Sequence, residues 1–368
     1  MTPIPLVDLR AAHAQVAAEI QAGFDEVMSK AAFIKGEVEA AFEKEYAEFT
    51  GVAHCVGVGN GTDALELALR AAEVPAGAEV VMPANTFVAT AEAVVRAGGR
   101  PVFVDADPDY LLLDPSLLPA ALNERTGAVM PVHLFGQMAP MTAVTEIAAQ
   151  HGAPIIEDAA QSHGATQDGR AAGSFGLLAG VSFYPGKNLG AYGDAGAVLT
   201  ESDDYARRVR LLGDHGSERR YEHLTIGFNS RLDTLQAVVL RAKLRRLAAD
   251  NEARRQAADR YAELLAGLPD VILPRTAPGN EHVWHLYTLR VPRRDNILSS
   301  LQAEGIGAGI HYPVPVHLQP AFRYLGYGPG DFPVAEAAAE QLLSLPLYPQ
   351  ITAEQQARVA EAVQRALK

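Results

Sequence analysis

Short apolar runs alternate with helix-patterned stretches between residues 52 and 200. Helix patterns such as residues 64–72 and 142–150 lie between the runs. Strands that alternate with helices predict an α/β domain whose mainly parallel central sheet is flanked by helices, with right-handed crossovers. Several runs are apolar throughout, as expected for strands covered on both faces. The predicted strands are residues 55–58, 79–82, 101–104, 128–134, 154–157, 180–183 and 197–200.

The pattern changes after a long stretch with few helix breakers. Residues 235–265 predict one long helix, which ends at Gly267-Leu268-Pro269. Beyond it we predict a smaller α+β domain with strand-like residues 283–291 and 308–312 and helical residues 297–304 and 353–367. The chain would then have three parts, namely an N-terminal helical arm (residues 1–35), a large α/β domain (residues 36–244) and a small C-terminal α+β domain (residues 245–368).

Composition excludes several classes of partner. The chain has 31 basic and 44 acidic residues, a formal net charge of −13. This sign disfavours a sequence-independent nucleic-acid surface or an anionic membrane surface, because both need clustered Lys and Arg. No segment approaches the ~20 apolar residues of a membrane span, and the N-terminus has no signal-like pattern. We predict a soluble cytoplasmic protein that binds neither nucleic acid nor membrane.

Cys55 is the single cysteine of the chain. It therefore forms no intramolecular disulfide, and no Cys-based zinc site can be built. Its apolar surroundings favour a buried structural thiol over a nucleophile. We expect no metal.

Lys187 carries the most specific chemical signal. It follows an apolar run and lies among Pro185, Gly186 and Gly190, which predicts a lysine on a tight turn. Asp158 follows another apolar run upstream, so both fall at the carboxyl ends of strands, where ligands bind in such sheets. An amine served by a carboxylate suits a Schiff base with a cofactor whose pyridine nitrogen the carboxylate keeps protonated. The alternative for Asp158 is an ordinary helix cap.

Residues 59–63 predict a phosphate site, because a glycine-containing turn follows a strand and opens a helix whose first N–H groups are free. The segment matches neither a Walker A loop nor the dinucleotide-binding pattern. Alone, it fits a strand–turn–helix corner capped by Thr62 or Asp63 equally well. Gln161 is placed to reach a phenolic oxygen of the cofactor ring. Phe87 is placed to stack on that ring, although a lone Phe is more often core.

Four segments together resemble the DegT/DnrJ/EryC1/StrS aminotransferases: residues 61–64, 157–161, 182–190 and 227–232. The resemblance covers almost the whole chain, in order. It implies a pyridoxal-phosphate enzyme of fold type I that acts on nucleotide-linked keto sugars, with L-glutamate as the amino donor. Some family members carry histidine in place of the lysine and are sugar dehydratases, whereas this chain keeps Lys187.

The resemblance also implies roles for single residues. Lys187 becomes the Schiff-base lysine, Asp158 the partner of the pyridine nitrogen and Gln161 the contact of the ring hydroxyl. Asn229 matches an asparagine that reaches the phosphate of the neighbouring subunit, which implies a homodimer with shared active sites. The other implied cofactor contacts are the phosphate cup and the stacking ring: Gly61, Thr62, Ser182 and Phe87.

The substrate is inferred from residues 309–318, which resemble the sugar-facing loop of family members acting on dTDP-linked 3-keto-6-deoxyhexoses, and from residues 283–287, which resemble the same subgroup. By that analogy His311, Tyr312 and Tyr184 contact sugar or pyrophosphate. Residues 214–221 are polar and predict an exposed mobile loop, in which Arg219 or Arg220 would meet the nucleotide diphosphate; plain solvent exposure is the equal alternative. Three other functions stay open: amination of a 4-keto sugar, amination of a cyclitol-type ring, and a non-catalytic regulator with the same fold.

Overall fold

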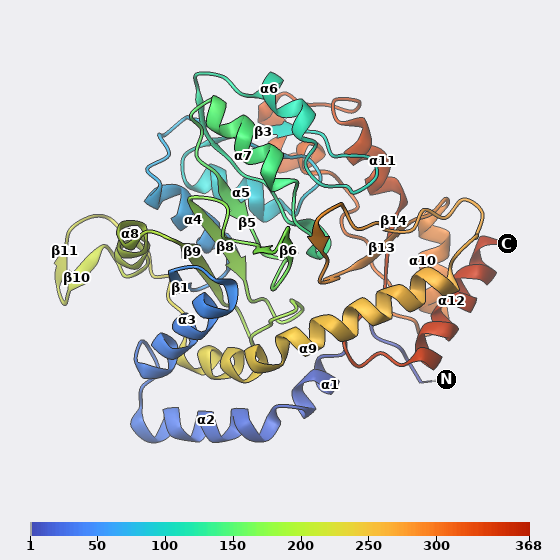
Figure 1. Cartoon of the computed structure of the whole chain (residues 1–368), viewed down its shortest axis with the longest axis horizontal. Coiled ribbons are helices and arrows are strands. Elements are labelled where there is room, and N and C mark those ends of the chain that lie inside the picture. Colours follow the sequence, from blue (N-terminus) through green and yellow to red (C-terminus); the bar gives the residue numbers. More distant parts are fainter. Residues whose placement is uncertain (1) are drawn as a thin grey trace.

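A seven-stranded sheet forms the centre of the molecule in the computed structural model, which describes residues 2–368. Hydrogen-bonded strands give the orders β1-β9-β8-β5 and β3-β2-β4, and parallel bridges from Val129 to Ile155 and from Val132 to Asp158 join β4 to β5 (Figure 1). The strands are β1 (His54–Val58), β2 (Glu79–Pro83), β3 (Arg100–Val104), β4 (Thr126–Val129), β5 (Ile156–Asp158), β8 (Leu178–Ser182) and β9 (Gly196–Thr200).

The sheet is mainly parallel, as predicted, with one exception. Strand β9 runs antiparallel to both of its neighbours, β8 and β1. The reason lies in the connection from β8 to β9, because residues 183–195 contain no helix and only turn back on themselves. A parallel neighbour would need a crossover of a dozen or more residues, usually helical. The returning loop carries Lys187 and holds it at the carboxyl end of β8.

Helices cover the sheet on both faces, and buried apolar side chains fill the space between. The predicted helix at residues 64–72 begins three residues earlier, at Gly61. Its cap is Asn60, whose Oδ1 accepts from the Asp63 N–H at 2.8 Å, so neither proposed cap residue was right. The helices are α3 (Glu37–Thr50), α4 (Gly61–Ala71), α5 (Val88–Arg96), α6 (Leu118–Ala121), α7 (Met141–Gln150) and α8 (Asp203–Gly213), with short 3-10 turns η1 (Pro115–Leu117) and η2 (Leu134–Gly136).

The C-terminal part begins along α9 (Thr234–Leu264), a single helix of 31 residues. It crosses residue 245 without a break, so the domain boundary stays a prediction. A second apolar core lies around the far half of this helix. The elements that follow are β12 (Asn280–Glu281), β13 (Tyr287–Arg290), α10 (Arg294–Ala303), η3 (Val316–Leu318), η4 (Pro320–Leu325), α11 (Pro333–Gln341), β14 (Leu342–Leu345) and α12 (Ala353–Leu367).

Two predicted strands of this part need correction. The strand expected at residues 283–291 shrinks to β13, which pairs with β14. The one expected at residues 308–312 is a single bridge between Gly309 and Ser344. Pro313 and Pro315 follow this bridge and lack the N–H groups that a continuing ladder needs.

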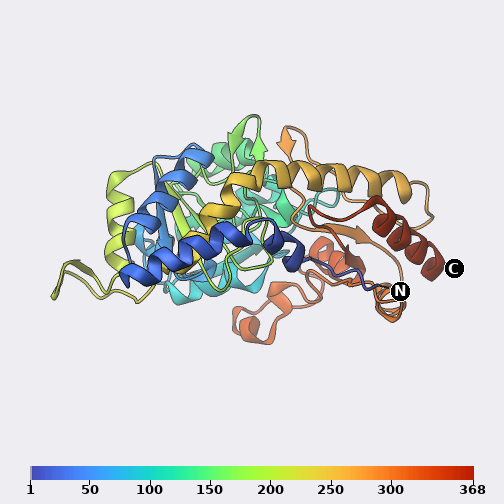
Figure 2. The same ribbon diagram turned by 90° about the horizontal axis from the view of Figure 1, so that it is seen from below.

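The N-terminal arm contains α1 (Leu9–Ala14) and α2 (Ala17–Lys30). Helix α2 packs on the first half of α9 through Ile20 and Val239. A small hairpin of β10 (Ser217–Arg219) and β11 (Glu222–His223) projects at one end of the molecule, with α12 at the other (Figure 2). Two further short strands, β6 (Thr166–Gln167) and β7 (Arg170–Ala171), pair beside β12. Among residues 2–368, no helix combines the length and apolar character that crossing a membrane requires.

Candidate active site

A cavity of about 750 Å³ opens at the carboxyl ends of β5 and β8. Its size suits a ligand of cofactor or sugar-nucleotide dimensions. Ten of the residues proposed from the sequence line it: Gly61, Thr62, Phe87, Asp158, Gln161, Ser182, Tyr184, Lys187, His311 and Tyr312. These residues come from both the large sheet and the C-terminal part, so the cavity lies between them.

Lys187 is held on a tight turn, as predicted. Its N–H donates to the Tyr184 carbonyl at 2.9 Å, and Lys243 Nζ donates to the Gly190 carbonyl at 2.6 Å. Any Cβ at Gly190 would collide with the Pro185 backbone, so only glycine closes this turn. Burial lowers the pKa of the Lys187 amine to about 8, although Asp158 acts against this shift. A larger share of the amine is therefore neutral near physiological pH than for an exposed lysine.

Asp158 faces the same cavity and is 5% exposed. Its Oδ2 accepts from Thr90 Oγ1 at 2.8 Å and its Oδ1 from the Ala160 N–H at 3.1 Å. Thr86 Oγ1 lies 2.7 Å from Thr90 Oγ1, so the two hydroxyls form a chain that ends on the carboxylate. Burial raises the pKa of Asp158, and these donors and Lys187 oppose the rise. The carboxylate is thus poised to gain a cationic partner inside the cavity.

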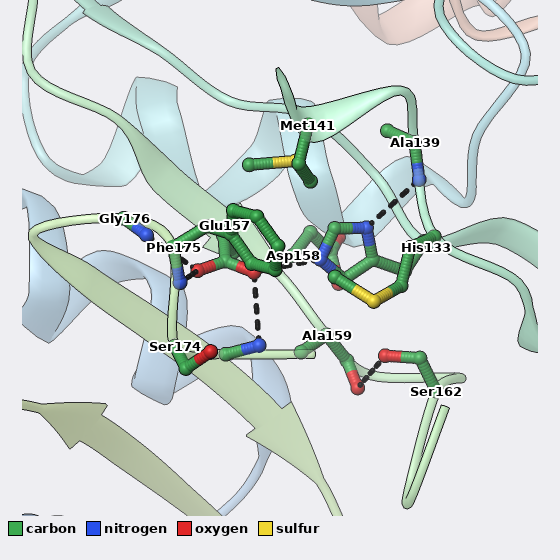
Figure 3. A network of polar contacts seen from close by, with 12 residues as sticks. His133, Ala139, Met141, Glu157, Asp158, Ala159, Ser162, Ser174, Phe175 and Gly176 are labelled. Atoms are coloured by element: carbon green, nitrogen blue, oxygen red, sulfur yellow. Dashed lines mark hydrogen bonds and ion pairs between the residues drawn. The ribbon is translucent and has the colours of Figure 1, made fainter. Parts of the chain in front are cut away.

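A buried hydrogen bond between His133 and Glu157 supports Asp158 from behind (Figure 3). Both His133 and Glu157 are 0% exposed, and His133 Nε2 lies 2.8 Å from Glu157 Oε2. The Ala139 N–H donates to His133 Nδ1, so Nε2 carries the proton and donates to the carboxylate. Glu157 also accepts from the N–H groups of Gly173, Phe175 and Gly176 at 2.8, 2.7 and 2.6 Å. The network anchors β5, on which Asp158 lies, to loop 173–176.

Glu157→Gln should destabilise the fold by about 3 kcal/mol at neutral pH, because an amide leaves buried donors of this network without acceptors. Burial opposes the charge of Glu157, but the bond from His133 and the backbone donors hold its pKa below the ordinary value. Its contribution is therefore present above the unfolded-state pKa and is lost as pH falls through the lower folded-state pKa. Urea unfolding at neutral and acidic pH measures both effects. Exposed Glu146→Gln is the control, and an equal loss for both variants would contradict the prediction.

The start of α4 provides free backbone donors. Asn60 takes up the N–H groups of Asp63 and Ala64, which leaves those of Gly61 and Thr62 for a ligand. Ser182 lies across from them, so close that a Cβ on Gly61 would approach the Ser182 Cβ to 2.5 Å. A helix N-terminus, two free N–H groups and the hydroxyls of Thr62 and Ser182 together suit a phosphate.

Gly61→Ala should lower cofactor affinity at least about tenfold, because the new methyl group pushes Ser182 and the helix start apart. Titrating the apo-protein with pyridoxal phosphate and following its absorbance measures this. Gly186→Ala is the matched control, since its Cβ would meet only the Tyr184 ring at an ordinary 3.7 Å. Unchanged affinity in Gly61→Ala would show that Gly61 does not contribute to phosphate binding.

Gln161 is oriented by the backbone. Its Oε1 accepts from the Phe135 N–H at 2.7 Å, and Phe135 adopts a left-handed φ of 60° to bring that N–H inward. The amide nitrogen is therefore turned into the cavity, where it donates to the Tyr312 hydroxyl at 3.1 Å. Tyr312 in turn lies against the Phe87 ring, with centroids 5.2 Å apart. Gln161 and Phe87 thus both line the cavity, and the roles that the resemblance implies for them stay predictions.

Two residues beside the site, Asn188 and His285, were not predicted from the sequence. Asn188 Nδ2 donates to Val283 O at 2.8 Å and to Asn251 Oδ1 at 2.9 Å, which ties the Lys187 loop to the C-terminal part. His285 lines the cavity and lies 3.3 Å from Asn188 Oδ1 through its Nδ1. The one sequence signal was that residues 283–287 resemble the same subgroup of the family as the sugar-facing loop.

Three predicted residues do not line this cavity: Asn229, Arg219 and Arg220. The segment expected to be a loop is in fact the β10–β11 hairpin (Figure 1). Both arginines are exposed on it. Asn229 lies at its base, where Arg231 Nη2 donates to Asn229 Oδ1 at 2.7 Å. Asp214 fixes the base by pairing with Lys35 at 2.6 Å and Arg231 at 2.9 Å.

The groups that line the cavity fit pyridoxal phosphate. A lysine with a lowered pKa, a buried carboxylate, an amide donor, an aromatic face and a phosphate-sized cradle lie around one space. Each corresponds to one functional group of that cofactor: the aldehyde, the ring nitrogen, the ring hydroxyl, the ring face and the phosphate. The cradle admits no Cβ at Gly61, which is the observation that makes the fit specific.

Comparisons with known proteins agree with this chemistry. A transaminase for dTDP-3-amino-3,4,6-trideoxy-α-D-glucose from Streptomyces venezuelae is 46% identical over 362 residues, covering 98% of this chain and 95% of that protein. A UDP-N-acetyl-3-dehydro-α-D-glucosamine 3-aminotransferase from Acidithiobacillus ferrooxidans is 46% identical over 366 residues, covering 100% and 98%. The crystal structure of DesV from S. venezuelae superposes with a TM-score of 0.98 at 44% identity, covering 100% of this chain and 99% of that one.

The family match extends over residues 14–364, nearly the whole chain. With the fold, the Lys187 loop and the phosphate cradle, it establishes a pyridoxal-phosphate-dependent enzyme that transfers amino groups. The chain belongs to the DegT/DnrJ/EryC1/StrS aminotransferase family.

Proposed function

We propose that this enzyme transfers the amino group of L-glutamate to the keto carbon of a dTDP-linked 3-keto-6-deoxyhexose. The observation that carries the proposal is Lys187, with its lowered pKa, in one cavity with Asp158 and the phosphate cradle. The dTDP-3-aminosugar transaminase from S. venezuelae supports the sugar and its regiochemistry. A non-catalytic regulator would have no need of all three features.

The cofactor, when bound, supplies an aldehyde that exchanges amino groups and a ring that accepts electrons. Lys187 would hold it at the aldehyde carbon, Asp158 at the ring nitrogen, and the start of α4 with Ser182 at the phosphate. Once displaced by the donor, the neutral Lys187 amine takes the proton from the α-carbon of glutamate. In the second half of the cycle the same amine delivers a proton to the sugar carbon that receives nitrogen.

We further propose a homodimer in which the β10–β11 hairpin reaches the partner subunit. Tyr221 is 82% exposed and Ile226 is 90% exposed on this projecting segment, an unusual exposure of apolar surface for a monomer. Asn229 and the two arginines, which do not line the cavity of their own subunit, would then contribute to the neighbouring one. Sedimentation measures the dimer. Mixing Lys187→Ala with Asn229→Ala subunits tests whether the active sites are shared. In the hybrid dimer one of the two sites would combine an intact Lys187 with an intact Asn229, so activity should reappear.

A second candidate substrate is a UDP-linked 3-keto sugar, because the relative from A. ferrooxidans is equally similar. Incubation with L-glutamate and a panel of dTDP-3-keto, dTDP-4-keto and UDP-3-keto sugars separates these readings. Product mass and the position of the new amine should identify C3 of a dTDP-sugar. Amination of C4, or of the UDP-sugar alone, would replace the proposed substrate.

A further inference from the structure

His285 is a buried imidazole with one nitrogen that the fold leaves unpaired. It lies just before β13, is 8% exposed and lines the Lys187 cavity. Its Nδ1 bonds to Asn188, whereas Nε2 makes no hydrogen bond within residues 2–368. Nε2 is not enclosed by the fold, so a ligand in the cavity can supply its hydrogen-bond partner.

Asn188 decides which ring nitrogen of His285 carries the proton. The Val283 carbonyl can only accept, so the Asn188 atom 2.8 Å from it must be the amide nitrogen. The other side-chain atom, Oδ1, therefore faces His285 and can only accept. It follows that Nδ1 of His285 is protonated and donates to Asn188 at 3.3 Å.

The second nitrogen of His285 carries no proton. Burial lowers the pKa of His285 well below its ordinary value, and the nearby charges of Lys187 and Arg254 act in the same direction. A neutral imidazole with its proton on Nδ1 presents a lone pair at Nε2. The cavity wall at this point is thus an acceptor. It repels phosphate and carboxylate oxygens and attracts hydroxyl groups.

We propose that His285 Nε2 accepts a hydrogen bond from a hydroxyl group of the bound sugar and so makes His285 a residue that selects the substrate. This inference rests on the proposed function. Tyr312, for which the family resemblance implies a contact with the sugar, lines the same cavity. His311 also lines it and lies close enough to His285 to help lower its pKa. A site built to bind a hydroxyl discriminates strongly against an analogue that lacks it.

The test combines one substitution with ligand analogues. The substitution His285→Phe removes the acceptor and keeps a planar ring. The control is His151→Phe, because His151 is an exposed histidine at the end of α7 that does not line this cavity. Calorimetry with dTDP-linked 3-amino-3,6-dideoxyhexose and its 2-deoxy and 4-deoxy analogues gives dissociation constants without catalysis. Wild type and His151→Phe should bind one analogue about tenfold more weakly than the parent sugar, whereas His285→Phe should bind that analogue and the parent sugar equally well.

The two half-reactions provide the second readout. His285→Phe should leave the glutamate half-reaction, followed by absorbance without sugar, within about twofold of wild type, and slow the sugar half-reaction about tenfold or more. If both half-reactions slowed equally, His285 would act through Lys187 and not through the sugar, and the proposal would be overturned. Undiminished discrimination between sugar and analogues in His285→Phe would also overturn it. Failure of the proposed function is distinguishable, because wild type would then not aminate or bind any of these sugars.

Discussion

Lys187→Ala should yield a folded protein in which amino-group transfer falls by at least ~10,000-fold. The substitution removes both the amine that holds the cofactor and the group that moves the proton, and general acid–base catalysis alone accounts for 10²–10⁴-fold. Lys187→Arg should be equally inactive, because guanidinium stays protonated and does not exchange. Mass spectrometry of sugar products over long incubations measures the residual rate.

The control for this prediction is Lys44→Ala, a change of an exposed lysine on α3 that should leave the rate unaltered. Borohydride reduction of the loaded protein should attach the cofactor to position 187 in wild type and to no position in Lys187→Ala. Transamination that persists in Lys187→Ala would contradict the assignment of the catalytic amine.

Asp158→Asn should lower the rate of both half-reactions by about 100- to 1,000-fold while the cofactor still binds. The amide occupies the same space and can accept from Thr90, but it has no charge to keep the ring nitrogen protonated, and preorganised charges of this kind contribute such factors. Stopped-flow absorbance of each half-reaction gives the rates, and the cofactor spectrum shows occupancy.

Thr90→Val is the informative companion to Asp158→Asn. It keeps the carboxylate but removes its hydroxyl donor, so a smaller loss, about tenfold, is expected together with a changed pH profile. A rate for Asp158→Asn close to that of wild type would show that the carboxylate does not serve the ring nitrogen.

The sequence predicted the positions of the strands that carry the site, but it did not predict the direction of every strand. Apolar runs identified β8 and β9, but periodicity cannot show that residues 183–195 turn back without a helix, and this made β9 antiparallel. The cap of α4 was also misplaced, because Asn60, Thr62 and Asp63 are all good cap residues in sequence. Only the backbone geometry chooses among them.

Single residues that act through space were the harder part of the site. Lys187 and Asp158 were found because strand ends of one sheet meet at one edge. Thr90 and His285 were not. Thr90 reaches the Asp158 carboxylate and His285 lines the cavity, each from an element whose packing no local pattern reveals. The β10–β11 hairpin was expected to be a loop because its polar residues give no strand period, and its two short strands are held mainly by each other.

Helix α9 contains neither glycine nor proline along its whole length and belongs to the cores on both sides of the cavity. Helices bend sharply almost solely at such residues or at inserted turns. The large sheet and the C-terminal part are thus joined by a single, rigid helix, and a hinge motion that bends this helix would cost free energy. We expect entry and exit of a bulky substrate to depend instead on movement of the segments at the cavity mouth.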